Sequence, residues 1–354
     1  MTIVAEALRR VLHEAGIPGS EEVFRSLLGL CPALVADADV HVERVNSRVF
    51  RLSSAVAGGA SVILKRLTPG VAERNELLIG RWLPAIGLPN AAPALLGTIG
   101  DRLDTAVWQV YEDLGPTVLE ARCPDPAAVS AAVELIAQLH TRAASSPVLT
   151  ECRVHLEDRG IGYFVSNVAA AIEALESLRP LEHTFSRAQR LVQDRLLERL
   201  DTLRASTPSR AQLMGELGGP DTLLHGDLWN INAIVVPTPT GPEVRFIDWD
   251  RAAVGPVSYD VSTFLYRFPP GERPWILRRY REAVHQSGWR LPEAADLNVL
   301  FETAECARYA NRVIWPAAAL INEGAESGHE ELAQILGWFE TLEPVLQQPG
   351  DSVA

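Results

Sequence analysis

The segment from His225 to Asn232, HGDLWNIN, carries side chains whose types and spacing could do chemistry. Asp227 and Asn232 are five residues apart, and Asp248 follows an apolar stretch sixteen residues after the asparagine. In phosphoryl transfer from a nucleotide, one carboxylate orients the attacking hydroxyl, while a second carboxylate and an amide oxygen bind Mg²⁺ on the phosphates. The spacing therefore predicts phosphoryl-transfer chemistry, with Asp227 as the catalytic carboxylate and with Asn232 and Asp248 as metal ligands.

A lysine would complete this set, and the chain contains a single one, Lys65, among 32 basic residues. It lies near the end of the strand-like segment SVILKRL. Since all the other basic residues are arginine, a position that stays lysine is expected to need a compact ammonium group. On the phosphoryl-transfer template, this ammonium neutralises phosphate charge.

These motifs resemble those of the aminoglycoside phosphotransferase and choline kinase family, whose mark is H-G-D-x-x-x-x-N followed by an apolar-Ile-Asp segment. Protein kinases have the same Asp-to-Asn spacing in H-R-D-x-x-x-x-N, with arginine where this chain has Gly226. The HGDLW form is also similar to fructosamine kinases. The resemblance covers roughly residues 45–265 and implies an α+β, protein-kinase-like fold, with a small β-rich N-lobe and a larger helical C-lobe.

The resemblance also implies roles for the nucleotide site. Lys65 binds the α- and β-phosphates of ATP or GTP, and Glu76 is its acidic partner, with Glu73 as an open alternative. Ser47 lies in a hairpin turn without a glycine-rich loop, where it either contacts phosphate or is a plain turn residue. The hinge that borders the base offers backbone groups from four residues: Tyr111, Glu112, Asp113 and Leu114. Asp250 is either an outer metal ligand or a support behind the ligands.

Other residues near the motif are interpreted as architectural. His225 is expected to brace the catalytic loop, and Asp260 either to brace it or to cap the following helix. Trp229 either packs beneath the loop or faces the substrate. Glu302 and Glu305 lie on a helical segment with aromatic neighbours, so they either line a substrate pocket or belong to the core and its solvated edge.

The elements that must position these residues follow from hydrophobic periodicity and from turn residues. Helices are expected at Ile3–Ala15, Glu21–Leu30 and Glu73–Leu83, from Asp125-Pro126 onward, through much of Leu156–Leu217, and across Pro274–Leu346. Strands are expected at Val40–Val45, Val49–Leu52, Ser61–Leu67, Thr105–Tyr111, Thr222–Leu224, Asn232–Val236 and Val244–Ile247, with a hairpin turn at Ala57–Ala60. The predicted division is an N-lobe at 1–112 and a C-lobe at 113–354.

Composition narrows the function classes. A net charge of −13 disfavours nucleic acid as a partner. No apolar run reaches the roughly 18 residues of a membrane helix, the N-terminal segment does not resemble a signal peptide, and four well-separated cysteines predict neither disulfides nor a zinc site. We expect a cytoplasmic monomer or homodimer that binds a nucleotide and a hydroxyl-bearing small molecule.

The function expected from the sequence is thus a Mg²⁺-dependent phosphotransferase that moves the γ-phosphoryl of ATP or GTP to an alcohol group. The arginine- and alanine-rich composition is typical of high-GC bacteria, where enzymes of this family often inactivate antibiotics, for resistance or self-protection. The alternatives are a metabolic kinase for choline, a sugar or a fructosamine, and a non-catalytic nucleotide-binding sensor.

Overall fold

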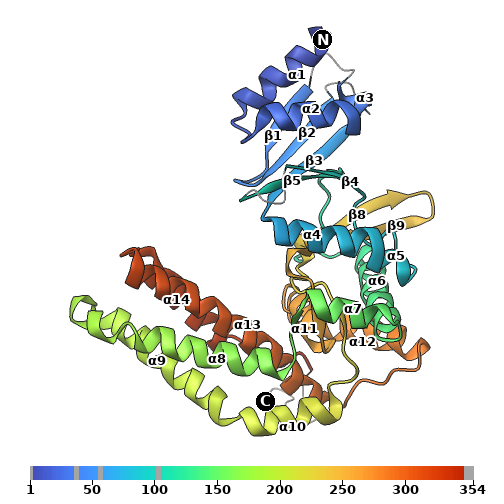
Figure 1. Cartoon of the computed structure of the whole chain (residues 1–354). Coiled ribbons are helices and arrows are strands. Elements are labelled where there is room, and N and C mark those ends of the chain that lie inside the picture. Colours follow the sequence, from blue (N-terminus) through green and yellow to red (C-terminus); the bar gives the residue numbers. More distant parts are fainter. Residues whose placement is uncertain (1–2, 36–39, 55–58, 101–104, 347–354) are drawn as a thin grey trace. The chain divides into compact units, whose positions relative to one another are not determined.

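The computed structural model describes residues 3–35, 40–54, 59–100 and 105–346, which form two compact units (Figure 1). Unit 1 comprises Met1–Leu119 and Ile231–Asp250, and unit 2 comprises Glu120–Asn230 and Arg251–Ala354. This division differs from the predicted boundary at 112/113, because a hairpin from the second half of the chain belongs to unit 1. Backbone hydrogen bonds hold it there: Leu119 N donates to the Ala233 oxygen, and Val235 N donates to the Thr117 oxygen, each at 2.8 Å.

Unit 1 is built on an antiparallel sheet in the order β1-β2-β3-β5-β4. Its strands are β1 (Val40–Arg44), β2 (Val49–Ser54), β3 (Ser61–Leu67), β4 (Leu95–Ile99) and β5 (Val107–Glu112). Four of them were predicted. β4 was not, because its five residues include Gly97, beside which the pairing register shifts. Residues 57 and 58 of the predicted turn at 57–60 lie outside the described residues.

Alternation along β3 and β5 gives the sheet two chemically different faces. Leu64 and Val110 are paired across the strands and lie in a hydrophobic cluster with α1 (Ile3–Glu14) and α2 (Ser20–Leu30). The short helix α3 (Pro32–Val35) follows α2. Lys65 and Gln109 form the next pair along, so their side chains point to the opposite face.

The helix after β3 lies on the Lys65 face. It comprises α4 (Pro69–Leu77), a π-helical turn (Leu78–Trp82) and α5 (Leu83–Ala85). It begins four residues before the predicted start at Glu73, because Pro69 at the first helical position is favourable there. The Gln109 side chain donates from Nε2 to the Ala72 oxygen at 2.9 Å, which fixes α4 against β5.

The remaining part of unit 1 is the hairpin of β8 (Ala233–Thr238) and β9 (Gly241–Phe246). The predicted loop PTPTGPE is mostly strand, with only two residues between β8 and β9. A short 3-10 turn (Asn230–Asn232) precedes the hairpin and another (Trp249–Arg251) follows it. The register brings Ile247 opposite Asn232, and Ile247 N donates to the Asn232 oxygen at 2.8 Å.

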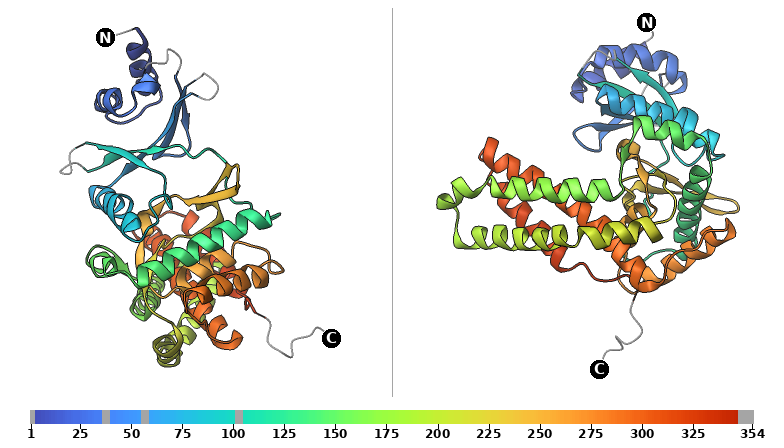
Figure 2. Two further views of the ribbon diagram at one scale, coloured as in Figure 1. Left: turned by 90° about the vertical axis from the view of Figure 1, so that its right-hand side faces the viewer. Right: turned by 60° about the horizontal axis from the view of Figure 1, so that its bottom comes forward.

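Unit 2 is mainly helical (Figure 2). Its helices are α6 (Pro126–Ala144), α7 (Val148–His155), α8 (Ile161–Glu176), α9 (Arg187–Ala205), α10 (Thr207–Leu217), α11 (Ser258–Leu265), α12 (Arg273–Gln286), α13 (Ala294–Asn322) and α14 (Ser327–Glu340), with a 3-10 helix at Arg179–Thr184. A small sheet has the order β6 (Glu157–Asp158), β10 (Ala253–Gly255), β7 (Thr222–Leu224). The predicted start of α6 is confirmed, because Asp125 accepts a hydrogen bond from Ala127 N and Pro126 is the first helical residue.

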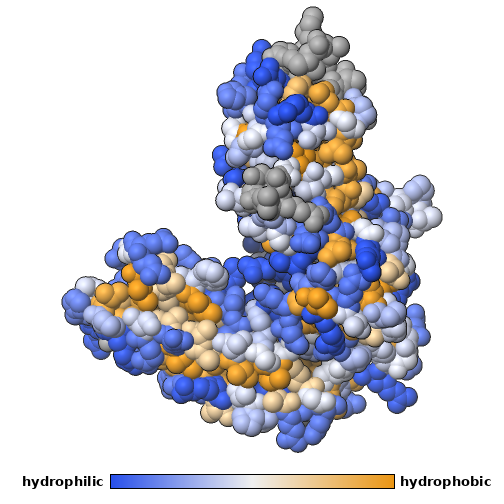
Figure 3. All heavy atoms as spheres, viewed as in Figure 1, coloured by the Kyte–Doolittle hydropathy of each residue, from blue (hydrophilic) through white to orange (hydrophobic). Residues whose placement is uncertain are grey.

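Charged and polar residues cover much of the face shown in Figure 3, and hydrophobic residues gather in patches between them. Within the described residues, no helix combines the length and the apolar character needed to cross a membrane.

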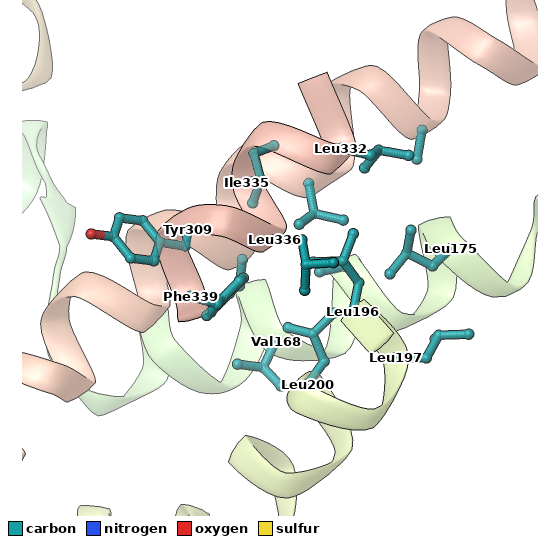
Figure 4. Packing of buried hydrophobic residues seen from close by; sticks show 14 of the residues in the cluster. Val168, Leu175, Leu196, Leu197, Leu200, Tyr309, Leu332, Ile335, Leu336 and Phe339 are labelled. Carbon is teal, nitrogen blue, oxygen red and sulfur yellow. The ribbon is translucent and has the colours of Figure 1, made fainter. Parts of the chain in front are cut away.

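Four helices of unit 2, α8, α9, α13 and α14, share a hydrophobic cluster (Figure 4). Leu196 and Leu200 of α9 lie against Val168 of α8, and Leu336 and Phe339 of α14 approach the same cluster. All five side chains are buried. This core fixes α8 and α13, which contribute to a cavity described below.

Candidate nucleotide and catalytic site

A cavity of about 540 Å³ lies within unit 1, in the size range of small-ligand sites. It includes most of the predicted nucleotide and metal residues: Lys65, Tyr111, Glu112, Asp113, Leu114, Asn232 and Asp248. Strand and turn residues complete one wall: Glu43, Val45, Asn46, Arg48, Val49, Arg51 and Ile63. Ser47 lies at the exposed tip between Asn46 and Arg48, so its phosphate contact stays a prediction.

Lys65 pairs with two carboxylates beside this cavity. Its Nζ atom lies 2.5 Å from Asp248 Oδ1 and 2.7 Å from Asp250 Oδ1. The side chains of Lys65 and Asp250 are only 15% and 19% exposed to solvent. The ammonium is thus held at one end of the cavity by charge-assisted hydrogen bonds.

The predicted pairing of Lys65 with Glu76 is corrected by the positions of the side chains. Glu76 Oε1 accepts a hydrogen bond from Thr98 Oγ1 at 2.6 Å, and the open alternative, Glu73, is exposed. Asn75 is the α4 residue that contacts the lysine's partners, with Nδ2 at 3.2 Å from Asp250 Oδ1. Adjacent helical residues point about 100° apart, so the helix that presents Asn75 to Asp250 turns Glu76 away.

A buried network continues from Asn75 into β5. Asn75 Nδ2 lies 3.3 Å from the Tyr111 hydroxyl, which donates to Gln109 Oε1. Burial raises the pKa of Tyr111 far above its usual value; the hydrogen bond from Asn75 opposes this rise, and the charges of Asp250 and Asp248 add to it. The hydroxyl is therefore protonated and remains a donor at any physiological pH.

Asn232 and Asp248 are suited to a hard cation such as Mg²⁺, because both offer oxygen donors to the same cavity. Asp248 has a φ of 64°, the only positive value at a non-glycine residue in the described parts of the chain. Such a backbone costs energy and is found preferentially at functional sites. Among the described residues, no group of three or more His, Cys, Asp or Glu side chains is placed to hold a metal ion.

The side chains of the predicted hinge are engaged with the protein. Asp113 contacts Arg51 Nε at 2.8 Å and Ser61 Oγ at 2.6 Å, and it accepts from Gly115 N at 2.9 Å. Burial alone would raise the pKa of Asp113, but these donors and the charge of Arg51 hold it below its usual value. Glu112 pairs with Arg245 at 2.8 Å. These contacts fix the course of the hinge backbone along the cavity.

The catalytic loop with Asp227 belongs to unit 2. Asp260, fully buried on α11, accepts from His225 N at 2.7 Å and from Gly226 N at 2.9 Å. The predicted bracing role of Asp260 is therefore confirmed. His225 is buried, and its Nδ1 accepts from Asp227 N at 3.3 Å, so it too supports the loop.

Gly226 is required by geometry. Its φ is 79°, and a Cβ atom there would overlap the carbonyl oxygen of Arg251. The glycine therefore allows the catalytic loop to lie directly against the segment that follows Asp250 in the chain.

Two residues behind the loop had no clear sequence signal. The His140 ring lies 3.4 Å from Asp260 Oδ2 and 2.8 Å from the Tyr280 hydroxyl. Nothing in the spacing of His140 or Tyr280 indicated these contacts. Trp229 also packs within unit 2, where the Arg267 guanidinium stacks 4.2 Å from the centre of its ring.

A second cavity, of about 850 Å³, lies within unit 2. Its wall includes Arg251, the residue that contacts Gly226, together with Tyr163 and Trp315, and the Trp315 side chain is 68% exposed. Two of its acids already have partners: Glu157 pairs with Arg159 at 2.9 Å, and Asp221 with Arg153 at 2.7 Å.

Of the two interpretations of Glu302 and Glu305, the structure supports the core and its edge and not the substrate pocket. Glu305 is fully buried and pairs with Arg308 at 2.5 Å. Glu302 pairs with Arg199 and Arg210, each at 2.9 Å. The α13 face that reaches the unit 2 cavity lies further along the helix, at Asn311 and Trp315.

Comparison with known proteins agrees with this architecture. The model of the phosphotransferase enzyme family matches residues 41–297. A structure of an aminoglycoside 2′-phosphotransferase with GDP has a TM-score of 0.59 at 14% identity, covering 90% of this chain and 97% of that one. A structure of a spectinomycin phosphotransferase with ADP and spectinomycin has a TM-score of 0.57 at 13% identity, and the match covers 86% of this chain and 91% of that one. The ethanolamine kinase of Plasmodium vivax has a TM-score of 0.54 at 14% identity, and the match covers 84% of this chain and 81% of that one.

The solved structures show the fold alone at these identities. A curated relative, described as an uncharacterized oxidoreductase of Caenorhabditis elegans, is 35% identical over 108 residues, which are 28% of this chain and 12% of that protein. The chain thus spans only a small part of the length of that relative. The family match covers most of the chain and includes the catalytic loop, Lys65 and Asp248. The chain has a protein-kinase-like fold and belongs to the phosphotransferase enzyme family.

Proposed function

We propose that this protein transfers the γ-phosphoryl group of ATP or GTP to a hydroxyl group of a small molecule. The observation that carries the proposal is the convergence of Lys65, Asn232 and Asp248 on the cavity that the hinge borders. A phosphate-binding ammonium and oxygen donors for a cation beside a nucleotide-sized cavity are the parts that phosphoryl transfer uses.

In the proposed reaction, the acceptor oxygen forms a bond to the γ-phosphorus as the bond to the bridging oxygen breaks, and ADP or GDP leaves. Asp227 orients the acceptor hydroxyl and takes its proton late, because the transition state is loose. Lys65 binds the α- and β-phosphates, and the backbone from Tyr111 to Leu114 positions the base. Mg²⁺, held by Asn232 and Asp248, would neutralise charge on the phosphates.

We place the acceptor in the unit 2 cavity. Its exposed Trp315 and its Tyr163 offer flat apolar surface, and Ser166 and Asn311 add hydrogen-bonding groups. Such a wall suits a ring-containing, hydroxylated molecule. We therefore favour an antibiotic as the acceptor, with inactivation as the outcome. Trp315→Ala is expected to raise the KM for the acceptor while Trp315→Phe largely preserves it; equal KM values in both variants would argue against this placement.

Two substitutions test the assignment of roles. Asp227→Ala is expected to keep nucleotide binding but to lose about 10²- to 10⁴-fold in kcat, the usual contribution of a general base. Asp248→Ala is expected to lose the Mg²⁺-dependent part of nucleotide affinity. Asp194→Ala, an exposed aspartate on α9, is the matched control. Retention of most of kcat by Asp227→Ala, or unchanged Mg²⁺-dependent affinity in Asp248→Ala, would contradict the proposal.

A further inference from the structure

We propose that Asp250, held in place by Asn75, is the positioning residue that fixes Lys65 at the phosphate end of the unit 1 cavity. The inference rests on the proposed function for its catalytic meaning, since it concerns how the phosphate-binding lysine is oriented. It gives to Asp250 the role that the sequence pattern had given to Glu76.

The hydrogen bonds of a single oxygen atom carry the inference. Asp250 Oδ1 accepts from Lys65 Nζ at 2.7 Å and from Asn75 Nδ2 at 3.2 Å. An ionised carboxylate that accepts from an ammonium and from an amide makes two charge-assisted hydrogen bonds. Because Lys65 and Asp250 are both largely buried, water competes only weakly for these bonds.

Asn75 is itself rigidly held, so it can transmit the geometry of the sheet to Asp250. Only 3% of its surface is exposed, and its Nδ2 also lies 3.3 Å from the Tyr111 hydroxyl. Gln109 bonds Tyr111 and is tied to the Ala72 oxygen at 2.9 Å. The network therefore joins β5, α4 and the segment after β9 at the lysine. An amide suits this place, because it can donate to a carboxylate and adds no second negative charge.

The two acids that contact Lys65 differ in a way that separates their tasks. The Asp248 side chain is 45% exposed and lines the cavity, whereas the Asp250 side chain is 19% exposed. A carboxylate that turns toward a cation cannot also be the lasting partner of the lysine. Asp250 can remain on Lys65 whichever partner Asp248 takes.

The single lysine of the chain makes this proposal directly measurable. Protein labelled with ¹³C-lysine gives one Cε signal, and its relaxation reports how firmly Lys65 is held. In the wild type we expect an order parameter typical of a fixed group, and in Asp250→Asn a fall below about 0.6, the range of flexible groups. Glu73→Gln, at an exposed position of the same helix, is the control and should match the wild type.

Glu76→Gln separates the two candidate partners. If Asp250 fixes Lys65, mobility rises much more in Asp250→Asn than in Glu76→Gln. A Lys65 signal that stays ordered in Asp250→Asn, or that loses order mainly in Glu76→Gln, would overturn the proposal.

A double variant that moves the carboxylate to a neighbouring position distinguishes loss of the Lys65 contact from general damage to the fold. Asn75→Asp combined with Asp250→Asn keeps one carboxylate and one amide at two positions that contact each other. We expect the double variant to recover part of the lost order at Lys65. Equal or greater mobility in the double variant than in Asp250→Asn alone would count against a positioning role.

Addition of Mg²⁺ and ADP to the labelled protein separates this inference from the proposed function. We expect the Lys65 signal to shift while staying ordered in the wild type. A missing shift would contradict nucleotide binding, and so the proposed function, while leaving the comparison of Asp250→Asn with Glu76→Gln intact. A shift accompanied by loss of order in the wild type would overturn the lasting Asp250 contact alone.

Discussion

Replacement of Asp260 by asparagine tests the brace of the catalytic loop within unit 2. The native carboxylate is fully buried and accepts from the backbone N–H groups of His225 and Gly226. Asparagine has the same shape but turns one acceptor oxygen into an NH₂ donor, which faces another donor. A hydrogen bond to a charged group contributes about 1.5–3 kcal/mol, and removal of one partner from a buried charged set costs about 3–5 kcal/mol. We expect Asp260→Asn to lower the free energy of unfolding by about 3–5 kcal/mol.

Such a loss is large beside the roughly 5–15 kcal/mol by which folded domains are stable. Thermal unfolding followed by circular dichroism should show a Tm at least about 5 °C lower in Asp260→Asn. The control is Asp194→Asn on α9, where the aspartate is exposed and the change should stay within about 0.5 kcal/mol.

The pH dependence of this Tm difference is an independent test, because its direction follows from the pKa of Asp260. Burial alone would raise the pKa of Asp260, but the His140 ring, the nearby His225 and the Gly226 N–H hold it below its usual value. A carboxyl with a lowered folded pKa stabilises the protein above its unfolded pKa of about 3.9 and loses this effect as pH falls. The Tm difference between wild type and Asp260→Asn should therefore be full at pH 7 and shrink below about pH 4. Equal Tm values at pH 7, or a difference that grows in acid, would refute the reasoning.

Three further predictions concern other features of unit 2. Gly226→Ala should abolish activity and lower Tm, because its Cβ would overlap the Arg251 carbonyl at a positive φ; a wild-type Tm would contradict this. Glu305→Ala should destabilise the protein by about 3–5 kcal/mol in urea unfolding, because it leaves the buried Arg308 charge uncompensated; a change as small as that of an exposed site would show that the pair contributes little. Burial raises the pKa of Cys152 and Cys306 to about 12 each, so at pH 8 the exposed Cys123 should react first with a thiol reagent, as peptide mapping would show.

Local sequence signals predicted the parts of the fold that depend on short-range chemistry. The alternating apolar residues of β3 and the Asp125-Pro126 helix start lie where the pattern indicated. The glycine of the HGD segment is also a local signal, because the positive φ of Gly226 lets the loop lie against Arg251; the catalytic role of Asp227 stays a prediction. Asp260 was predicted either to brace the loop or to cap the following helix, and its contacts with the N–H groups of His225 and Gly226 show the brace.

Features that depend on tertiary packing could not be predicted from the sequence. Asn75 and Glu76 are adjacent, and only the packing of α4 on β5 decides which of them meets the lysine's partner. The sequence left Glu305 open between a pocket and the core, and the turn of α13 buries it against α11, where Ser262 donates to it at 2.9 Å. Trp315 was one of the aromatic neighbours of Glu302 and Glu305 on that helical segment, and only the packing of α8 and α13 shows that the tryptophan, and not the two acids, lies at a cavity wall.

The most direct test of the central claim is a mass-spectrometric transfer screen with Mg²⁺ and ATP or GTP. The acceptor panel would hold aminoglycosides, nucleoside antibiotics, macrolides, choline, ethanolamine, simple sugars and a fructosamine, and Asp227→Ala and metal-free samples would be the controls. We expect one antibiotic class to gain a single phosphoryl group, and we expect the product to be lost in both controls. No product from any acceptor, together with no Mg²⁺-dependent nucleotide binding, would contradict the proposed function.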